Sequence, residues 1–198
     1  EIIENYGADA VRLFMLSDSP PEKDVQWTEQ GIVACYKFIQ KLWTLHEKIK
    51  EKLKTTEKSQ QNSDEISIFT NQLIDKVNTN LEKFHNNVIV ANFYETYNFL
   101  IKKIEKPVNK KNLIENYTKI LKLMSPILPH FTSECLEELK CDNKLDWPVT
   151  DKKVSTVENY KIVVQINGKK RDIINTNLNM DEKTLINEIK KNSITNKF

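Results

Sequence analysis

Gly31-Ile-Val-Ala-Cys-Tyr-Lys-Phe-Ile-Gln-Lys-Leu-Trp-Thr-Leu-His-Glu-Lys-Ile-Lys-Glu-Lys-Leu53 is the stretch that decides the fold of this chain of 198 residues. One side of it repeats at steps of three and four, which is the pattern of an amphipathic helix packed on its neighbours. The residues of this stripe are Ile32, Cys35, Tyr36, Ile39, Leu42, Trp43, His46, Ile49 and Leu53. Thr28 is a suitable N-cap, because its hydroxyl can accept a hydrogen bond from a free amide of the first turn. The sequence therefore predicts a long helix that begins after Thr28.

The opposite face of this predicted helix is basic. Its cations are Lys37, Lys41, Lys48 and Lys52. Lysines at helical spacing can contact the phosphates of a nucleic acid, but they are also typical of a solvated surface. Lys37 and Lys41 are therefore candidate RNA-binding residues, and the spacing alone leaves both interpretations open.

Two loops separate this helix from its neighbours. Apolar spacing predicts a short helix between Ile2 and Leu16, and the prolines of Ser17–Asp24 then predict a rigid loop, because proline lacks an amide hydrogen. Lys54–Glu65 contains no apolar residue. Such a segment buries too little to offset its ordering entropy, so a mobile loop is predicted there.

The helical pattern resumes after this second loop. It predicts helices over 66–104, with a kink or short turn near His85, then over 113–124 and over 129–139. Asn residues beside His85 compete for backbone hydrogen bonds, which favours the turn. The fold is therefore predicted to be mostly α, with an antiparallel helical bundle from about Trp27 to Lys140.

The periodicity changes near the carboxyl terminus. Lys161–Ile166 and Lys169–Thr176 flank Asn167-Gly168, and Asn-Gly is the strongest short signal for a β-hairpin with a type I′ turn. The predicted cross-strand pairs are Ile166 with Lys169, Gln165 with Lys170 and Val164 with Arg171. Lys169, Lys170 and Arg171 would then gather at one end of the hairpin, as expected of phosphate contacts, although a solubilising edge strand also uses lysine.

A helix over 185–189, capped by Asp181, is predicted to follow this hairpin. Strand, strand and helix without return strands make an incomplete α+β domain over 161–198. The predicted organisation is a connector at 1–26, the bundle at 27–148, a linker at 149–160 and this small domain.

Composition restricts the class of protein. With 39% hydrophobic and 29% charged residues, the chain resembles an ordinary globular protein. No apolar run reaches the ~20 residues that cross a bilayer, and no charged-then-apolar leader is present, so no membrane contact and a cytoplasmic location are expected. The net charge of +2 hides an acidic start and a basic remainder, which suits a polyanionic partner but also a Lys/Glu-rich solvated surface.

No catalytic or metal-binding constellation is recognisable. Three cysteines in no metal-ligand spacing indicate reduced, mostly buried thiols and no metal site. Only three glycines are present, too few for a glycine-rich phosphate loop. His130 has no nucleophile or metal ligand nearby in sequence, so a packed or capping histidine is expected rather than a catalytic one.

Several stretches resemble one enzyme family, the bacterial and organellar leucyl-tRNA synthetases. Tyr6-Gly-Ala-Asp-Ala-Val-Arg-Leu-Phe-Met-Leu is similar to the segment that follows their catalytic fold. Met124-Ser-Pro-Ile-Leu-Pro-His-Phe-Thr is similar to a helix shared by the leucine, isoleucine, valine and methionine enzymes. Val163-Val-Gln-Ile-Asn-Gly-Lys-Lys-Arg171 resembles the start of the family's carboxy-terminal domain and separates leucine from the sister enzymes. In one departure, Ala34 stands where the family usually has a second glycine.

The resemblance implies the fold of a class Ia anticodon-binding bundle and a chain that is part of a longer enzyme. A first residue other than Met and the absence of a cap signal after Thr195 fit this expectation. It further implies that the hairpin docks on the elbow of tRNA and that the bundle holds the tRNA body. ATP and Mg would serve the whole enzyme, and neither is assigned to this chain, because the family's nucleotide-binding signatures and editing domain do not occur in it.

The predicted function is therefore that of the tRNA-binding portion of an enzyme that attaches leucine to tRNA(Leu) with ATP. The expected partners are tRNA(Leu) and the catalytic and editing domains of the same polypeptide, and a monomer is expected. The candidate tRNA-binding residues are Lys37, Lys41, Lys169, Lys170 and Arg171. The alternative hypothesis is a non-catalytic helical module with a small α/β appendage that binds protein rather than RNA.

Overall fold

The computed structural model describes residues 1–17, 23–24, 26–55, 65–141 and 146–151, and the backbone of 159–166 and 169–177. Contacts divide the chain into two units, Glu1–Val154 and Ser155–Phe198. The described part of the first unit contains the helices α1 (Ile2–Tyr6), α2 (Ala8–Ser17), α3 (Glu29–Lys54), α4 (Glu65–Glu82), α5 (Asn86–Ile104), α6 (Lys110–Met124) and α7 (Pro129–Glu138). The second unit contains the strands β1 (Asn159–Ile166) and β2 (Lys169–Asn177).

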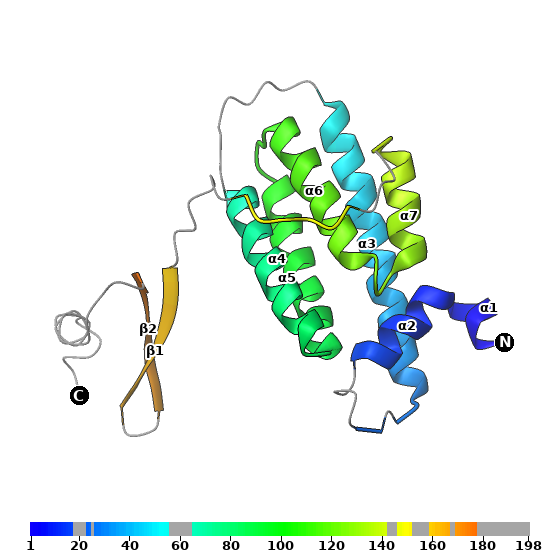
Figure 1. The fold of residues 1–198 in the computed structure, drawn as a ribbon, viewed down its shortest axis with the longest axis horizontal. Coiled ribbons are helices and arrows are strands. Elements are labelled where there is room, and N and C mark those ends of the chain that lie inside the picture. Colours follow the sequence, from blue (N-terminus) through cyan, green and yellow to red (C-terminus); the bar gives the residue numbers. More distant parts are fainter. Residues whose placement is uncertain are drawn as a thin grey trace. The chain divides into compact units, whose positions relative to one another are not determined.

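Helices α3 to α7 form the predicted antiparallel bundle, each running opposite to the one before it (Figure 1). Their apolar stripes meet in one core with Leu13 and Phe14 of α2. Among its largest fully buried side chains are Ile32, Leu45, Ile74, Phe93, Leu113 and Ile120. The mostly α fold class predicted from the sequence is confirmed.

Helix α3 begins as the sequence predicts. The Thr28 hydroxyl accepts a hydrogen bond from the amide of Gly31 at 3.1 Å. Gly31 also allows α2 to approach α3 closely, because a Cβ at this position would overlap the ring of Phe14. Ala34, the departure from the family pattern, is exposed on α3 and leaves this contact unchanged.

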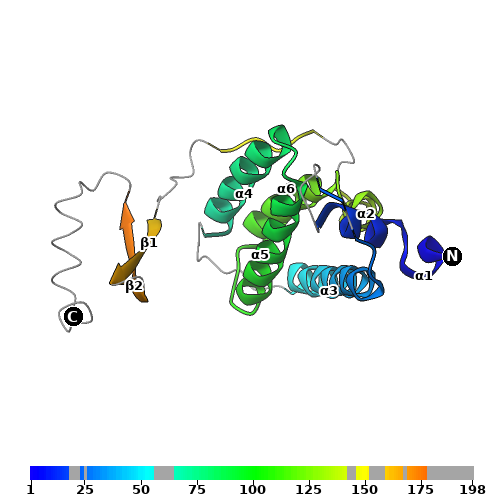
Figure 2. The same cartoon turned by 90° about the horizontal axis from the view of Figure 1, so that it is seen from below.

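The amino-terminal segment differs from its prediction. A single short helix was expected between Ile2 and Leu16, but Gly7 adopts a φ of 82° and separates α1 from α2. A positive φ is readily available to glycine, which has no Cβ. Helix α2 then packs against α3, α5 and α7 (Figure 2).

The predicted turn near His85 is confirmed. Helix α4 ends at Glu82, and the His85 amide donates to the carbonyl of Asn80 at 2.9 Å before α5 begins. Phe84 reverses the chain with a φ of 54° and is 70% exposed. Pro129 occupies the first turn of α7, where its missing amide hydrogen costs nothing.

In the second unit, β1 and β2 form an antiparallel hairpin. Lys169 pairs with Ile166 and Lys170 with Gln165, as predicted. The third predicted pair is wrong: Val164 pairs with Asp172, so Arg171 is the extra residue of a bulge. Counting pairs outward from a two-residue turn assumes one residue opposite one residue, whereas a bulge adds one residue to a single strand.

Several predicted features lie outside the described residues. They are most of the loops at 17–24 and 54–65, much of the linker at 149–160, the turn at Asn167-Gly168 and the helix over 185–189. The α+β class of the small domain and the bounds of the four predicted segments stay predictions. Within the described segments, every helix is too short or too polar to span a lipid bilayer.

Candidate functional site

The candidate lysines of the bundle lie on the solvent face of α3. Lys37 and Lys41 are one helical turn apart, and both are exposed. Neither forms an ion pair or hydrogen bond with any described residue. Their ammonium groups are therefore accessible to an external anion, as they would be on any solvated helix.

The candidate cations of the hairpin follow one another on β2. Lys169 and Lys170 begin the strand, and Arg171 forms the bulge. The structure thus brings the three hairpin residues together along one backbone and brings Lys37 together with Lys41. The two sets belong to different units of the chain.

A second basic feature was not identified from the sequence. The end of α3 and the start of α6 border a groove of about 540 Å³. Its lining residues are Lys50, Leu53, Lys54, Lys110, Lys111, Ile114, Glu138 and Leu139. The sequence holds one usable signal: Asn109 caps α6 through its side chain, and two lysines follow in a first turn that has no acidic residue.

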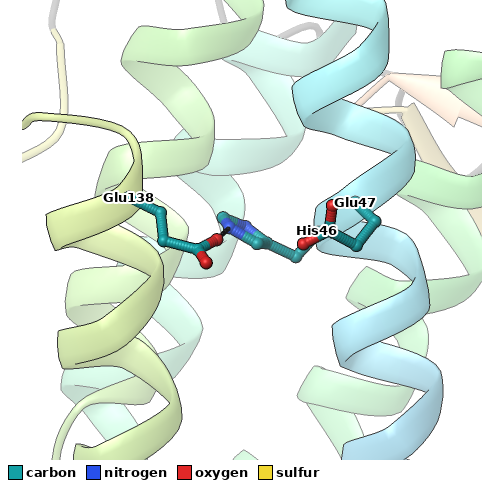
Figure 3. A group of neighbouring side chains, drawn as sticks. All are labelled: His46, Glu47 and Glu138. Carbon is teal, nitrogen blue, oxygen red and sulfur yellow. Dashed lines mark hydrogen bonds and ion pairs between the residues drawn. The ribbon is translucent and has the colours of Figure 1, made fainter.

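Within the bundle, a polar network links α3, α6 and α7. His46 is fully buried, and its Nδ1 lies 3.1 Å from the Tyr117 hydroxyl. Its Nε2 lies 2.9 Å from Oε2 of Glu138, toward which the ring points in Figure 3. The Lys50 ammonium donates to the same Glu138 oxygen at 2.8 Å and to Glu47 at 2.9 Å. The helical periodicity predicts that His46 lies on the buried face of α3, but it does not predict Tyr117 or Glu138 as its partners.

Burial and charge determine the protonation of this network. Burial lowers the pKa of His46 despite the hydrogen bond that the ring makes to the Glu138 carboxylate, so a neutral ring is favoured. Lys50 and then His46 lower the pKa of Glu138, which favours its carboxylate. The Nε2 hydrogen therefore donates to Glu138, and Nδ1 accepts from Tyr117.

His46, Glu47 and Glu138 have the donor types of a metal site, and their ligand atoms lie within 4.8 Å of one another. Lys50, however, already bonds both carboxylates. Both ring nitrogens of His46 are also engaged. Hydrogen bonds within the protein thus account for the whole group, and we assign no metal to it.

A second polar cluster connects α2 to the start of α7. The carboxylate of Asp9 accepts hydrogen bonds from the backbone amide of Phe131 at 2.7 Å and from Nδ1 of His130 at 2.9 Å. Arg12, one turn later, donates to the carbonyls of Pro126 and Ile127 at 2.6 and 3.2 Å. His130 is mostly exposed and contacts the capping carboxylate, so its described contacts give it a structural role.

The cysteines lie within the helical unit. Cys35 and Cys135 are buried, and burial raises the pKa of each thiol, which keeps both protonated. Cys141 is half-buried, with its Sγ 3.3 Å from the Thr118 hydroxyl. This arrangement favours packing rather than thiolate chemistry.

Comparison with known proteins gives this geometry a context. Residues 63–186 match the family described as the anticodon-binding domain of tRNA ligase. The chain is 36% identical over 182 residues to the leucine–tRNA ligase of Bartonella tribocorum, covering 86% of this chain and 20% of that protein. It is 32% identical over 197 residues to the leucine–tRNA ligase of Granulibacter bethesdensis, covering 94% of this chain and 22% of that protein. The chain thus spans about a fifth of the length of these relatives.

A solved structure shares the fold. It is the ternary complex of Agrobacterium radiobacter K84 LeuRS, tRNA and LeuAMS, with a TM-score of 0.78 and 22% sequence identity. The match covers 99% of this chain and 27% of that chain. These comparisons confirm the resemblance inferred from the sequence.

Proposed function

Because this chain belongs to the family of anticodon-binding domains of tRNA ligases, we propose that it is the tRNA-binding part of a leucine–tRNA ligase. The observation that carries the proposal is its similarity to leucine–tRNA ligases over most of its length, at 36% identity for the Bartonella tribocorum protein. The whole enzyme would attach leucine to tRNA(Leu) with ATP and Mg. We assign no catalytic residue and no cofactor to this chain.

The two units would divide the work of holding tRNA. Lys37 and Lys41 present exposed cations on α3, where they would attract the backbone of the tRNA body. Lys169, Lys170 and Arg171 start β2, where they would contact the elbow. Phosphate contacts of this kind supply affinity and position but carry no sequence information, so leucine specificity would arise elsewhere in the enzyme.

The remaining partners follow from the same proposal. The catalytic and editing domains of one polypeptide would adjoin this part, and the enzyme would act as a cytoplasmic monomer. The helical unit has an extensive core of its own, which supports a role as a rigid platform for RNA.

The direct test is binding of a tRNA(Leu) transcript to the 198-residue chain across a range of salt concentrations. We expect affinity to fall linearly on a log–log plot, because Lys and Arg contacts release counterions from RNA. Leucine-dependent exchange of pyrophosphate into ATP should stay at background. Absence of tRNA binding, together with salt-independent capture of a protein partner, would contradict the proposal and favour a protein-interaction module.

A further inference from the structure

The groove between the end of α3 and the start of α6 is shallow, and its charged lining residues are mostly lysines. Four of its lining residues are lysines, and one, Glu138, is acidic. The Glu138 carboxylate already bonds both Lys50 and His46. Lys54, Lys110 and Lys111 form no ion pair with any described residue, so they leave the groove with an excess of positive charge.

Helix stability explains only part of this charge. Lys54 ends α3, where a cation interacts favourably with the negative end of the helix dipole. Lys110 and Lys111 open α6, where the dipole is positive and cations are unfavourable. Their position therefore opposes the stability of α6, and no acidic residue in the first turn offsets it. An external anion bound in the groove would offset this unfavourable charge.

This groove is separate from the lysine face predicted from the sequence. Lys54 follows Lys41 by thirteen residues, roughly 20 Å along the axis and about 220° around it. A single phosphate therefore cannot contact both. The groove also draws its cations from two helices, α3 and α6, and Leu53 and Ile114 lie among its lining residues.

We propose that this groove is a binding site for consecutive backbone phosphates of the bound tRNA. The proposal rests on the proposed function, because the anion it names is the tRNA of that function. Lys110 and Lys111 of α6 would contact phosphates of one stretch of the tRNA backbone, and Lys54 of α3 would contact a phosphate of the same stretch. Lys50, held by Glu138 and Glu47, would keep the Glu138 carboxylate from repelling the RNA.

The test compares two double variants of equal charge change in the 198-residue chain. K110Q/K111Q removes the groove cations at the start of α6, and K37Q/K41Q removes two from the α3 face. Binding of a tRNA(Leu) transcript is measured against salt concentration. We expect K110Q/K111Q to bind more weakly and to lower the log–log slope by about 1.4 to 1.8, since each contact releases about 0.7 to 0.9 counterion. K37Q/K41Q, whose lysines the proposed function also places on the tRNA backbone, gives the loss in affinity and slope for two exposed cations on one helix face and is the reference.

A second readout separates this site from a merely structural role. Removing two cations from the positive end of α6 should raise the melting temperature of free K110Q/K111Q by a few degrees while binding weakens. If the melting temperature and the tRNA affinity of K110Q/K111Q both fell, the two lysines would be stabilising the fold, and the proposal would be overturned.

Other outcomes also decide the question. Unchanged affinity and salt slope for K110Q/K111Q would overturn the groove as an RNA-binding site while the proposed function stands. If the unmodified chain binds no tRNA, both fail.

Discussion

The carboxylate of Asp9 accepts a hydrogen bond from the amide of Phe131 at 2.7 Å, so a side chain of α2 caps a helix that begins about 120 residues later. Leu128, the local N-cap residue of α7, provides no side-chain hydrogen bond. Arg12 binds the carbonyls of the preceding turn. Arg12 thus binds carbonyls of the turn between α6 and α7, and Asp9 binds an amide of the helix that follows it.

Replacing Asp9 with Asn should destabilise the helical unit. The substitution removes the negative charge at the positive end of α7 and turns an acceptor pair into one acceptor and one donor. We expect a loss of about 1 to 3 kcal/mol in the free energy of unfolding by urea denaturation. D75N, on an exposed position of α4, is the control. H130A should cost less than D9N, because the backbone amides would keep their acceptor; an equal loss would contradict the capping role.

Gly31 should resist substitution by alanine. Alanine favours a helix over glycine by about 1 kcal/mol, but its Cβ would overlap the Phe14 ring. Overpacking of a core costs about 1 to 3 kcal/mol, so thermal unfolding should show net destabilisation. The G31A substitution should destabilise the F14L protein less than it destabilises the original chain, because the smaller leucine side chain leaves room for the Cβ. A G31A protein that is more stable than the original would show that α2 moves away freely.

Local signals explain what the sequence predicted well. Thr28 caps the helix that directly follows it, and the apolar stripe of α3 needs no knowledge of its partners. Pairing beside the hairpin turn is equally local, so Lys169 and Lys170 were placed correctly. The bulge at Arg171 follows directly after these two pairs, and the type of turn does not predict it.

The missed features all join residues that are distant in the sequence. Asp9 contacts Phe131, His46 contacts Glu138, and Lys54 and Lys110 line one groove only after the helices have packed. Periodicity identifies which face of a helix is buried but not which polar group on another helix lies opposite. The polar part of the site therefore follows from tertiary packing.

Acid should destabilise the helical unit through His46. Burial lowers the pKa of His46 in the folded protein below its ordinary value near 6.5. The unfolded chain then binds more protons, so stability is complete above about pH 6.5 and falls as pH decreases toward the folded pKa. Glu138, whose pKa is also lowered, adds a loss only further down, below about pH 4.5. Melting temperatures between pH 7 and 5 should decline more steeply for the original chain than for H46Q. Parallel curves would show that His46 does not titrate in this range.

The last prediction concerns the hairpin and the helical unit as RNA surfaces. Lys169, Lys170 and Arg171 are consecutive on β2, two of them in the register that a two-residue turn predicts. If they contact tRNA backbone, K169Q/K170Q/R171Q should weaken binding of tRNA(Leu) and lower the log–log salt slope by at most about 2 to 3. K37Q/K41Q/K48Q supplies the matched change of three charges on α3. Circular dichroism must show that both variants keep their secondary structure.

The comparison assigns the elbow contact to one unit or the other. A hairpin variant that loses affinity and slope, beside an α3 variant that loses less, would support docking of the hairpin on the tRNA elbow. Unchanged affinity and slope in the folded hairpin variant, with losses in the α3 variant, would show that the helical bundle is the main RNA surface. The groove variant K110Q/K111Q, measured in the same series, then tells whether that surface is the face of α3 or the groove beside α6.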